Sequence, residues 1–123
     1  MASFTVLLVD DDKFMRRFLT LAFAKAGYAI LEAEDANIGF DLLTKNNPDF
    51  VVCDQVMPGM SGTDFYKKMR TMDQFKDLPF LILSGEDVTL PADPFARVLK
   101  KPVMPSQILE FVTKWSPQNK AAS

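Results

Sequence analysis

Four places in this sequence carry side chains that could act together in phosphoryl chemistry: the acidic run at residues 10–12, then Asp54, Ser84 and Lys101. Carboxylates brought close together repel one another, and Mg²⁺ relieves that repulsion because it prefers a few carboxylates with water and phosphate oxygens. With its charge balanced in this way, Asp54 could act as a nucleophile toward a phosphoryl group. Lys101 could pair with the phosphoryl oxygens as a point charge, and Ser84 could donate a hydrogen bond to them.

Each of these residues also has a purely structural explanation when it is taken alone. The acidic run at residues 10–12 could lie at the N-terminus of a helix, where negative charge is favourable. Within that run, Asp12 is expected to cap the helix. Ser84 and Gly85 could form a turn, and Lys101 could be an ordinary solvated lysine. A shared site is favoured because all of these positions follow short apolar runs, which predict strands.

The elements that would position these residues can be read from the alternation of short apolar runs with amphipathic stretches. This pattern is typical of βαβ units around a parallel sheet. We expect strands at residues 4–9, 28–33, 50–53, 79–83 and 97–100, and helices at residues 13–26, 36–45, 63–72 and 105–115. The pattern predicts a doubly wound α/β sheet, in which ligands bind outside the carboxyl ends of the strands. The acids, Ser84 and Lys101 would all lie at that edge.

Apolar residues at helical spacing mark faces of the first two helices, and Gly27 is a plausible stop for the first. On the helix at residues 13–26, the apolar positions that share one face are Phe14, Phe18, Leu21 and Ala22. On the helix at residues 36–45, the positions expected to point inward are Ile38, Leu42 and Leu43.

The connection between the last two strands is short for a helical crossover. Residues 85–96 number only twelve and include Pro91 and Pro94, while a crossover between parallel strands needs a dozen residues or more. Proline inside a helix costs about 3 kcal/mol or more and disfavours helical conformation at the preceding residue. The fourth helix is therefore predicted to be a single turn or missing.

Composition excludes several classes of function. The chain has 123 residues, which suit one domain, and a net charge of −2, which does not favour binding to nucleic acid by charge. It has one cysteine and no histidine, so it can form no internal disulfide, Ser-His-Asp system or histidine-based zinc site. No apolar run reaches the ~20 residues of a membrane span, and no signal peptide is evident. We expect a cytoplasmic protein with no membrane partner.

The ordered set of motifs resembles the receiver domain of two-component response regulators. The likeness rests on Val9-Asp10-Asp11, on Asp54 with the loop Met57-Pro58-Gly59-Met60-Ser61-Gly62, on Ser84, and on Lys101-Pro102. Each motif alone is weak, but each follows a predicted strand. The resemblance implies a flavodoxin/CheY-like fold with strand order 2-1-3-4-5 over residues 4–115, and it leaves residues 116–123 as a polar tail or the start of a linker.

The resemblance also implies a role for each site residue. Asp54 would be the phosphoacceptor, with Ser84 and Lys101 contacting the phosphoryl group. The metal, Mg²⁺ or Mn²⁺, would be held by Asp10, Asp11, Asp54 and the backbone carbonyl of Val56. The donor would be a phosphohistidine of a histidine kinase or histidine phosphotransfer protein. The phosphorylated domain would change shape, bind a downstream protein that the sequence does not name, and lose the group slowly by its own hydrolysis.

Two departures from the family pattern concern the output of such a switch. Family members usually carry Tyr or Phe three residues before the lysine, where this chain has Val98. The shortened stretch at residues 85–96 would also remodel the usual partner face. These departures leave open a second hypothesis, a degenerate receiver that binds proteins without being phosphorylated.

An enzyme on a similar fold is a third possibility, and the sequence argues against it. An aspartate-nucleophile phosphatase would need a second acid two residues after Asp54, where Val56 stands. A flavin carrier would need a hydroxyl- and glycine-rich phosphate loop after the first strand, but three aspartates stand there and would repel a phosphate. The glycine motif of a dinucleotide-binding enzyme is also missing. We therefore expect a phosphoacceptor domain and not an enzyme.

Overall fold

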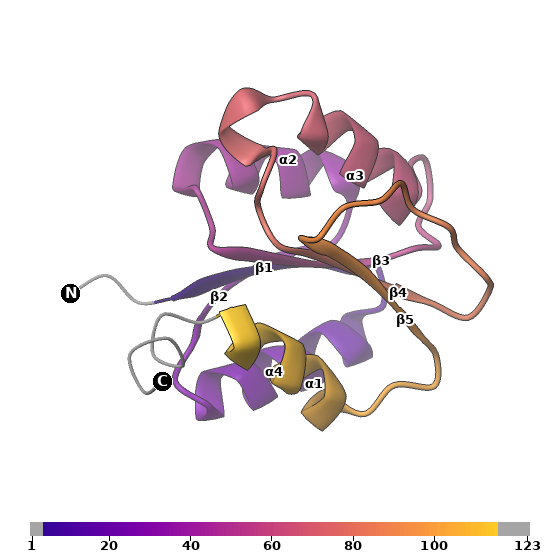
Figure 1. Cartoon of the computed structure of the whole chain (residues 1–123). Helices are drawn as coiled ribbons and strands as arrows, with labels where there is room; N and C mark the ends of the chain where they lie inside the picture. The colour runs from indigo at the N-terminus through magenta and orange to yellow at the C-terminus, as the bar shows by residue number, and fades with distance from the viewer. Residues whose placement is uncertain (1–3, 116–123) are drawn as a thin grey trace.

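A five-stranded parallel sheet forms the centre of the protein in the computed structural model, which describes residues 4–115 (Figure 1). The strand order is β2-β1-β3-β4-β5, which confirms the predicted doubly wound sheet and its order 2-1-3-4-5. In chain order the elements are β1 Thr5–Val9, α1 Lys13–Lys25, β2 Ala29–Ala33, α2 Ala36–Asn46, β3 Phe50–Asp54, α3 Gly62–Arg70, the 3₁₀ helix η1 Asp73–Phe75, β4 Phe80–Ser84, β5 Ala96–Lys100 and α4 Pro105–Trp115.

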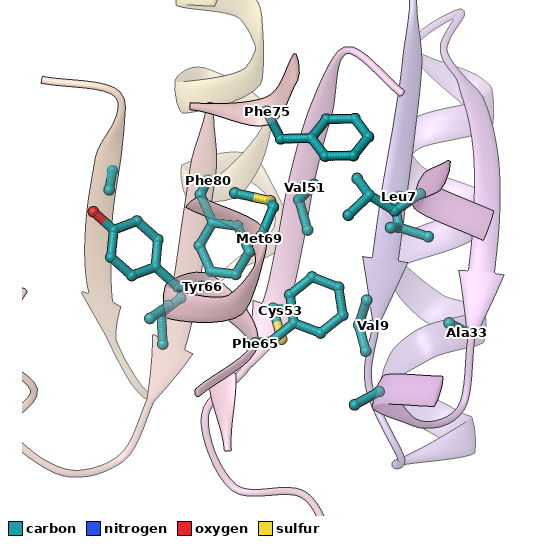
Figure 2. Packing of buried hydrophobic residues seen from close by; sticks show 14 of the residues in the cluster. Leu7, Val9, Ala33, Val51, Cys53, Phe65, Tyr66, Met69, Phe75 and Phe80 are labelled. Atoms are coloured by element: carbon teal, nitrogen blue, oxygen red, sulfur yellow. The ribbon is translucent and has the colours of Figure 1, made fainter. Parts of the chain in front are cut away.

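Two layers of helices cover the sheet, with α2 and α3 on one face and α1 and α4 on the other (Figure 1). Because successive side chains of a strand point to opposite faces, Leu7 and Val9 of β1 join the cluster under α2 and α3. Val6 and Leu8 join the cluster under α1 and α4. The ring of Phe65 from α3 packs beside Val9 and β3 (Figure 2). Both faces of the central strands are therefore buried, and only their ends are free for chemistry.

Helix α1 begins and ends where the sequence predicts. The Asp12 carboxylate accepts hydrogen bonds from the backbone N–H groups of Phe14 and Met15, which confirms it as the N-cap. At the other end, Gly27 has a φ of +96°, and the N–H of Tyr28 donates to the carbonyl of Phe23. This is the geometry of a Schellman stop, which glycine adopts without steric strain.

The apolar stripe that the sequence places on one face of the first helix is largely exposed. Phe14, Phe18 and Leu21 have 89%, 58% and 63% of their surface exposed, while Leu19 and Phe23 are buried under the sheet. The two stripes lie on adjacent sides of one helix, and both have helical spacing. Only contact with the sheet selects between them, so a substantial apolar surface remains uncovered in this chain.

On α2, the prediction that Ile38 points inward is wrong, because Ile38 is 37% exposed. Leu43 is fully buried and Leu42 packs against the core, as expected. The buried line runs instead through Ala36, Gly39 and Leu43. At Gly39 an added Cβ would lie 2.8 Å from the Phe65 ring, so small residues are needed where α2 meets α3. Small residues give little hydrophobic signal in a sequence.

Residues 85–95, between β4 and β5, form no helix, which confirms that the fourth helix of the family pattern is missing. The segment is instead anchored on α3. The Asp93 carboxylate accepts hydrogen bonds from the Tyr66 hydroxyl at 2.6 Å and from Nε of Arg70 at 2.9 Å. Leu90 packs against the core from the middle of the segment. The connection is thus an extended loop that a few side-chain contacts hold against α3 and the core.

Two sequence expectations concern the limits of the chain. Across residues 4–115, the structure contains no helix with the length and hydrophobicity that a membrane crossing requires. The polar tail expected at residues 116–123 lies outside the described residues.

Candidate phosphoacceptor and metal site

The carboxyl ends of four strands bring the predicted site residues to one edge of the sheet. Asp10 follows β1, and Lys101 follows β5. Asp54 and Ser84 are the last residues of β3 and β4, whereas the sequence placed each one residue past its strand. The strands extend one residue further because the ladder continues through the pair Asp54 and Leu83, and through Ser84 opposite Lys100. The side chains of Asp54 and Ser84 are therefore attached to backbone that is paired in the sheet.

Three carboxylates form a compact cluster. Asp10, Asp11 and Asp54 each offer an oxygen within 4.8 Å of the others. Asp10 and Asp54 are buried, with 1% and 6% of their surface exposed, whereas Asp11 is exposed. The cluster is therefore buried at Asp10 and Asp54 and accessible to solvent at Asp11. Hard oxygen ligands in this number suit Mg²⁺, which keeps several waters and phosphate oxygens in its remaining positions.

Burial and a neighbouring carboxylate make the ionised form of Asp10 unfavourable. Its burial raises the pKa of its carboxyl to about 6, and the nearby charge of Asp54 adds to this effect. A hydrogen bond from the backbone N–H of Asp12, at 2.9 Å, and the charge of Lys101 act in the opposite direction. Ionised Asp10 is thus unfavourable here unless more positive charge is supplied, and a divalent cation would supply it.

Lys101 lies directly against Asp54. Its Nζ is 2.6 Å from Oδ1 of Asp54, and 38% of the lysine side chain is exposed. The backbone N–H of Lys101 donates to the carbonyl of Ser84 at 2.7 Å, which fixes the lysine at the end of β5 beside β4. The structure therefore brings Lys101 to the acidic cluster, and the exposed side chain leaves its ammonium room to follow an incoming anion.

Ser84 is at the site edge, but its hydroxyl is engaged elsewhere. Oγ of Ser84 donates to the carbonyl of Glu86 at 2.8 Å and accepts from the N–H of Glu86 at 3.0 Å. This is the local turn that the sequence left open as an alternative. To donate to a group on Asp54, the hydroxyl has to leave the Glu86 carbonyl, so such contact would disturb the start of the 85–95 segment.

Val56 lies in the loop after β3, two residues past Asp54, with 67% of its surface exposed. The use of its backbone carbonyl as a metal ligand stays a prediction. The loop as a whole is tied back by Gln55, whose side-chain oxygen accepts from the N–H and the hydroxyl of Thr63 at 2.8 and 2.9 Å. The sequence analysis missed this role of Gln55, since a lone glutamine after a strand carries no signal of such a contact.

Gly62, which the sequence analysis named only as part of the loop motif, is a second support of the site. Its N–H donates to the carbonyl of Gln55 at 2.9 Å. An added Cβ would lie 2.7 Å from the backbone oxygen of Asp54. The start of α3 can approach the acceptor strand this closely only because residue 62 has no side chain. Its place at the end of a loop rich in proline and glycine was the signal available in the sequence.

Comparison with known proteins gives a consistent result. The sequence profile of the response regulator receiver domain matches residues 6–113. The response regulator MprA of Mycobacterium sp. (strain KMS) is 35% identical over 82 residues, which cover 67% of this chain and 35% of that protein. The chemotaxis protein CheY-3 of Vibrio cholerae is 38% identical over 82 residues, covering 66% of this chain and 63% of that protein.

The fold has close counterparts among solved structures. The chemotaxis protein CheY4 of Vibrio cholerae, crystallised at low pH, superposes with a TM-score of 0.81 at 30% identity. The superposition covers 92% of this chain and 98% of CheY4. By contrast, the matched part of this chain spans only about a third of the length of MprA.

Proposed function

The chain belongs to the response regulator receiver domain family of two-component signalling, and from this premise we propose that Asp54 accepts a phosphoryl group from a partner's phosphohistidine. The observation that carries the proposal is the convergence of Asp10, Asp11 and Asp54 within 4.8 Å, with Nζ of Lys101 2.6 Å from Asp54. We take the receiver domain to span residues 4–115.

Receiver domains typically bind Mg²⁺, and the donor set of this site fits that ion. Asp10, Asp11, Asp54 and the carbonyl of Val56 would hold it. Bound Mg²⁺ supplies positive charge that offsets the repulsion between the carboxylates and the phosphoryl oxygens. Since burial and Asp54 already raise the pKa of Asp10 to about 6, the site has an electrostatic reason to take up a cation.

The transfer itself needs little covalent chemistry from the protein. A carboxylate oxygen of Asp54 forms a bond to phosphorus while the bond from phosphorus to the donor's imidazole nitrogen breaks. Lys101 moves from Asp54 to a phosphoryl oxygen and balances its charge, and Ser84 donates its hydroxyl proton in a hydrogen bond to another. Water later cleaves the acyl phosphate slowly, which returns Asp54 to its carboxylate. No separate substrate is turned over, so the domain acts as a switch and not as an enzyme.

Receiver domains interact with histidine kinases and histidine phosphotransfer proteins. Residues 1–123 contain no histidine, which agrees with a donor histidine that lies outside this domain. A donor that brings a phosphohistidine to Asp54 must cover the rim of the site. Three exposed apolar residues follow Asp12, Asp54 and Lys101 by two or three positions in the chain: Phe14, Val56 and Met104, with 89%, 67% and 65% of their surface exposed. We infer that this apolar rim, continued along α1 by Phe18 and Leu21, receives the donor protein.

Output differs from the usual family pattern in this chain. Val98 stands where an aromatic side chain is expected, and residues 85–95 replace a helix. The Ser84 hydroxyl is bonded to Glu86 of that segment at both its donor and its acceptor side. We therefore propose that phosphorylation is read out through the 85–95 segment by a downstream protein.

The chemistry is tested by incubating the protein with acetyl phosphate and Mg²⁺ and recording its intact mass. A gain of one phosphoryl group is expected, which is lost with EDTA and in Asp54→Asn. Asp12→Asn is the matched control, because asparagine caps a helix as well as aspartate does and leaves the three clustered carboxylates unchanged. It should be phosphorylated like the wild type. If folded protein takes up no phosphoryl group from acetyl phosphate or from a phosphohistidine protein, the degenerate binding module becomes the better hypothesis.

A further inference from the structure

Arg16 joins helix α1 to the strand end that carries the acidic cluster. Its Nη1 donates to the backbone carbonyl of Asp10 at 2.7 Å, and its Nε pairs with Oε1 of Glu32 on β2 at 3.2 Å. The arginine side chain is only 12% exposed. The planar guanidinium of Arg16 thus links the backbone of Asp10 to Glu32 on the neighbouring strand β2. Its donors have a fixed geometry, which suits it to hold two groups at once.

The bond from Arg16 completes the support of Asp10. Asp10 lies one residue past β1, where the paired ladder ends. Its N–H donates to the carbonyl of Ala33 at 3.0 Å, and its carboxylate accepts from the N–H of Asp12 at 2.9 Å. The remaining backbone group, the carbonyl, belongs to the peptide that links Asp10 to Asp11. A rotation of that peptide would swing both carboxylates, and Arg16 opposes it.

We propose that Arg16 is a positioning residue for the divalent-cation site, acting through the peptide between Asp10 and Asp11. This inference rests on the proposed function, because it presumes that the cluster binds Mg²⁺. Arg16 is a cation and would not itself be a ligand of the ion. It orients two of the carboxylates, much as groups that surround metal ligands do in other sites, where their removal typically costs about 10–100-fold in metal affinity.

The direction of the change in Mg²⁺ affinity distinguishes a positioning role of Arg16 from an effect of its charge. Arg16 is a cation near a cation site, so removing its charge would by itself strengthen Mg²⁺ binding. Loss of positioning weakens binding instead. Arg17 provides a matched comparison, since its Nη1 also pairs with Glu32, at 3.0 Å, and it carries the same charge. Within residues 4–115, Arg17 is bonded to Glu32 and not to Asp10, and its side chain is 60% exposed.

The test is the Mg²⁺ dissociation constant of the whole chain, measured by isothermal titration calorimetry without phosphodonor. Arg16→Gln is expected to weaken binding by about 10-fold or more. Arg16→Lys retains the charge but loses the fork that serves Asp10 and Glu32 together, so we expect a several-fold weakening. Arg17→Gln should bind within about two-fold of the wild type or slightly more tightly. Circular dichroism and urea unfolding establish whether each variant is folded. If Arg16→Gln does not fold, the Mg²⁺ affinity of Arg16→Lys tests the inference.

Three results would overturn the inference. Folded Arg16 variants that bind Mg²⁺ as tightly as the wild type would exclude a positioning role. An equal loss in Arg17→Gln would assign the effect to the shared partner Glu32 and not to the contact with Asp10. A wild-type protein that binds no Mg²⁺ would overturn the proposed metal site and this role with it, whereas the first two results leave the proposed function intact.

Discussion

At the scale of single residues, Asp10 is a buried carboxylate whose negative charge is unfavourable without nearby positive charge. Because its pKa in the folded protein is raised from 3.8 to about 6, folding disfavours its ionised form. The contribution of Asp10 to the stability of the metal-free protein is therefore lost as pH rises from about 4 through 6, and the loss is complete above that range. We expect Asp10→Asn to stabilise the metal-free protein by on the order of 1–3 kcal/mol at about pH 8.

This prediction is checked by urea unfolding in EDTA, where the advantage of Asp10→Asn should shrink as pH is lowered to about 4. In Mg²⁺ the order should reverse, because the variant lacks one carboxylate ligand. A variant that is less stable than the wild type in EDTA at high pH would show that Asp10 is not strained.

Gly62 makes a second prediction at this scale. A Cβ at residue 62 would lie 2.7 Å from the backbone oxygen of Asp54, so Gly62→Ala must push α3 away from the acceptor strand. We expect a loss of about 1–3 kcal/mol in unfolding free energy and weaker Mg²⁺ binding. Gly85→Ala is the control, since a Cβ there has nothing within 4 Å. It should be neutral or slightly stabilising, and equal effects of the two substitutions would contradict the argument.

At the scale of elements, α1 carries one buried and one exposed apolar stripe. Replacing Phe14 and Phe18 by serine should change the unfolding free energy by no more than about 0.5 kcal/mol each, because both rings are largely exposed. Leu19→Ala on the buried stripe should cost about 2–5 kcal/mol. If the exposed stripe receives the donor, the serine variants will accept phosphate slowly from a phosphohistidine protein.

Acetyl phosphate distinguishes docking from chemistry in these α1 variants, because a small donor needs no protein surface. The serine variants should react with acetyl phosphate at the wild-type rate while transfer from the donor protein falls. Equal transfer from the donor protein to variants and wild type would place the docking surface elsewhere.

The 85–95 segment depends on Asp93, whose carboxylate accepts from Tyr66 and Arg70 of α3. Burial raises the pKa of Asp93, but hydrogen bonds from Tyr66, the N–H of Phe95 and Arg70 outweigh it and lower the pKa below 3.8. Its contribution to stability is therefore present above about pH 4 and is lost as pH falls through the lowered pKa. Asp93→Asn should cost about 1–3 kcal/mol at neutral pH.

Urea unfolding across the acid range tests the role of Asp93. The difference in unfolding free energy between Asp93→Asn and the wild type should narrow as the pH falls through the lowered pKa of Asp93, because the wild-type carboxyl then becomes protonated. A difference that is constant with pH would mean that the network acts without the charge of Asp93.

At the scale of the whole molecule, Mg²⁺ binding should be linked to folding, because the three carboxylates meet only in the folded sheet. At a free Mg²⁺ concentration of ten times the dissociation constant, the gain is about 1.4 kcal/mol. For a domain of this size we expect a rise in Tm of on the order of 5 °C. Thermal unfolding with Mg²⁺, compared with NaCl of equal ionic strength, measures it, and Asp54→Asn should show a smaller rise.

Much of the fold and of the site could be predicted from the sequence, because the relevant signals are local. The apolar runs mark buried strands, and parallel strands put their carboxyl ends at one edge. This places Asp10, Asp54 and Lys101 together without further information. Prolines at 91 and 94 exclude a regular helix by lacking N–H donors, so the missing fourth helix was also predictable.

Other features depend on contacts between distant segments and were decided only by the tertiary structure. Two stripes on α1 have helical spacing, and the sheet buries the one with Leu19 and Phe23 while leaving Phe14 and Phe18 in solvent. Likewise, nothing near Arg16 in the sequence distinguishes it from Arg17. In the described part of the chain, Arg16 donates to the Asp10 carbonyl, whereas Arg17 donates to Glu32. Periodicity reports which residues share a face of a helix. Which face meets the core is decided by packing against strands that lie elsewhere in the chain.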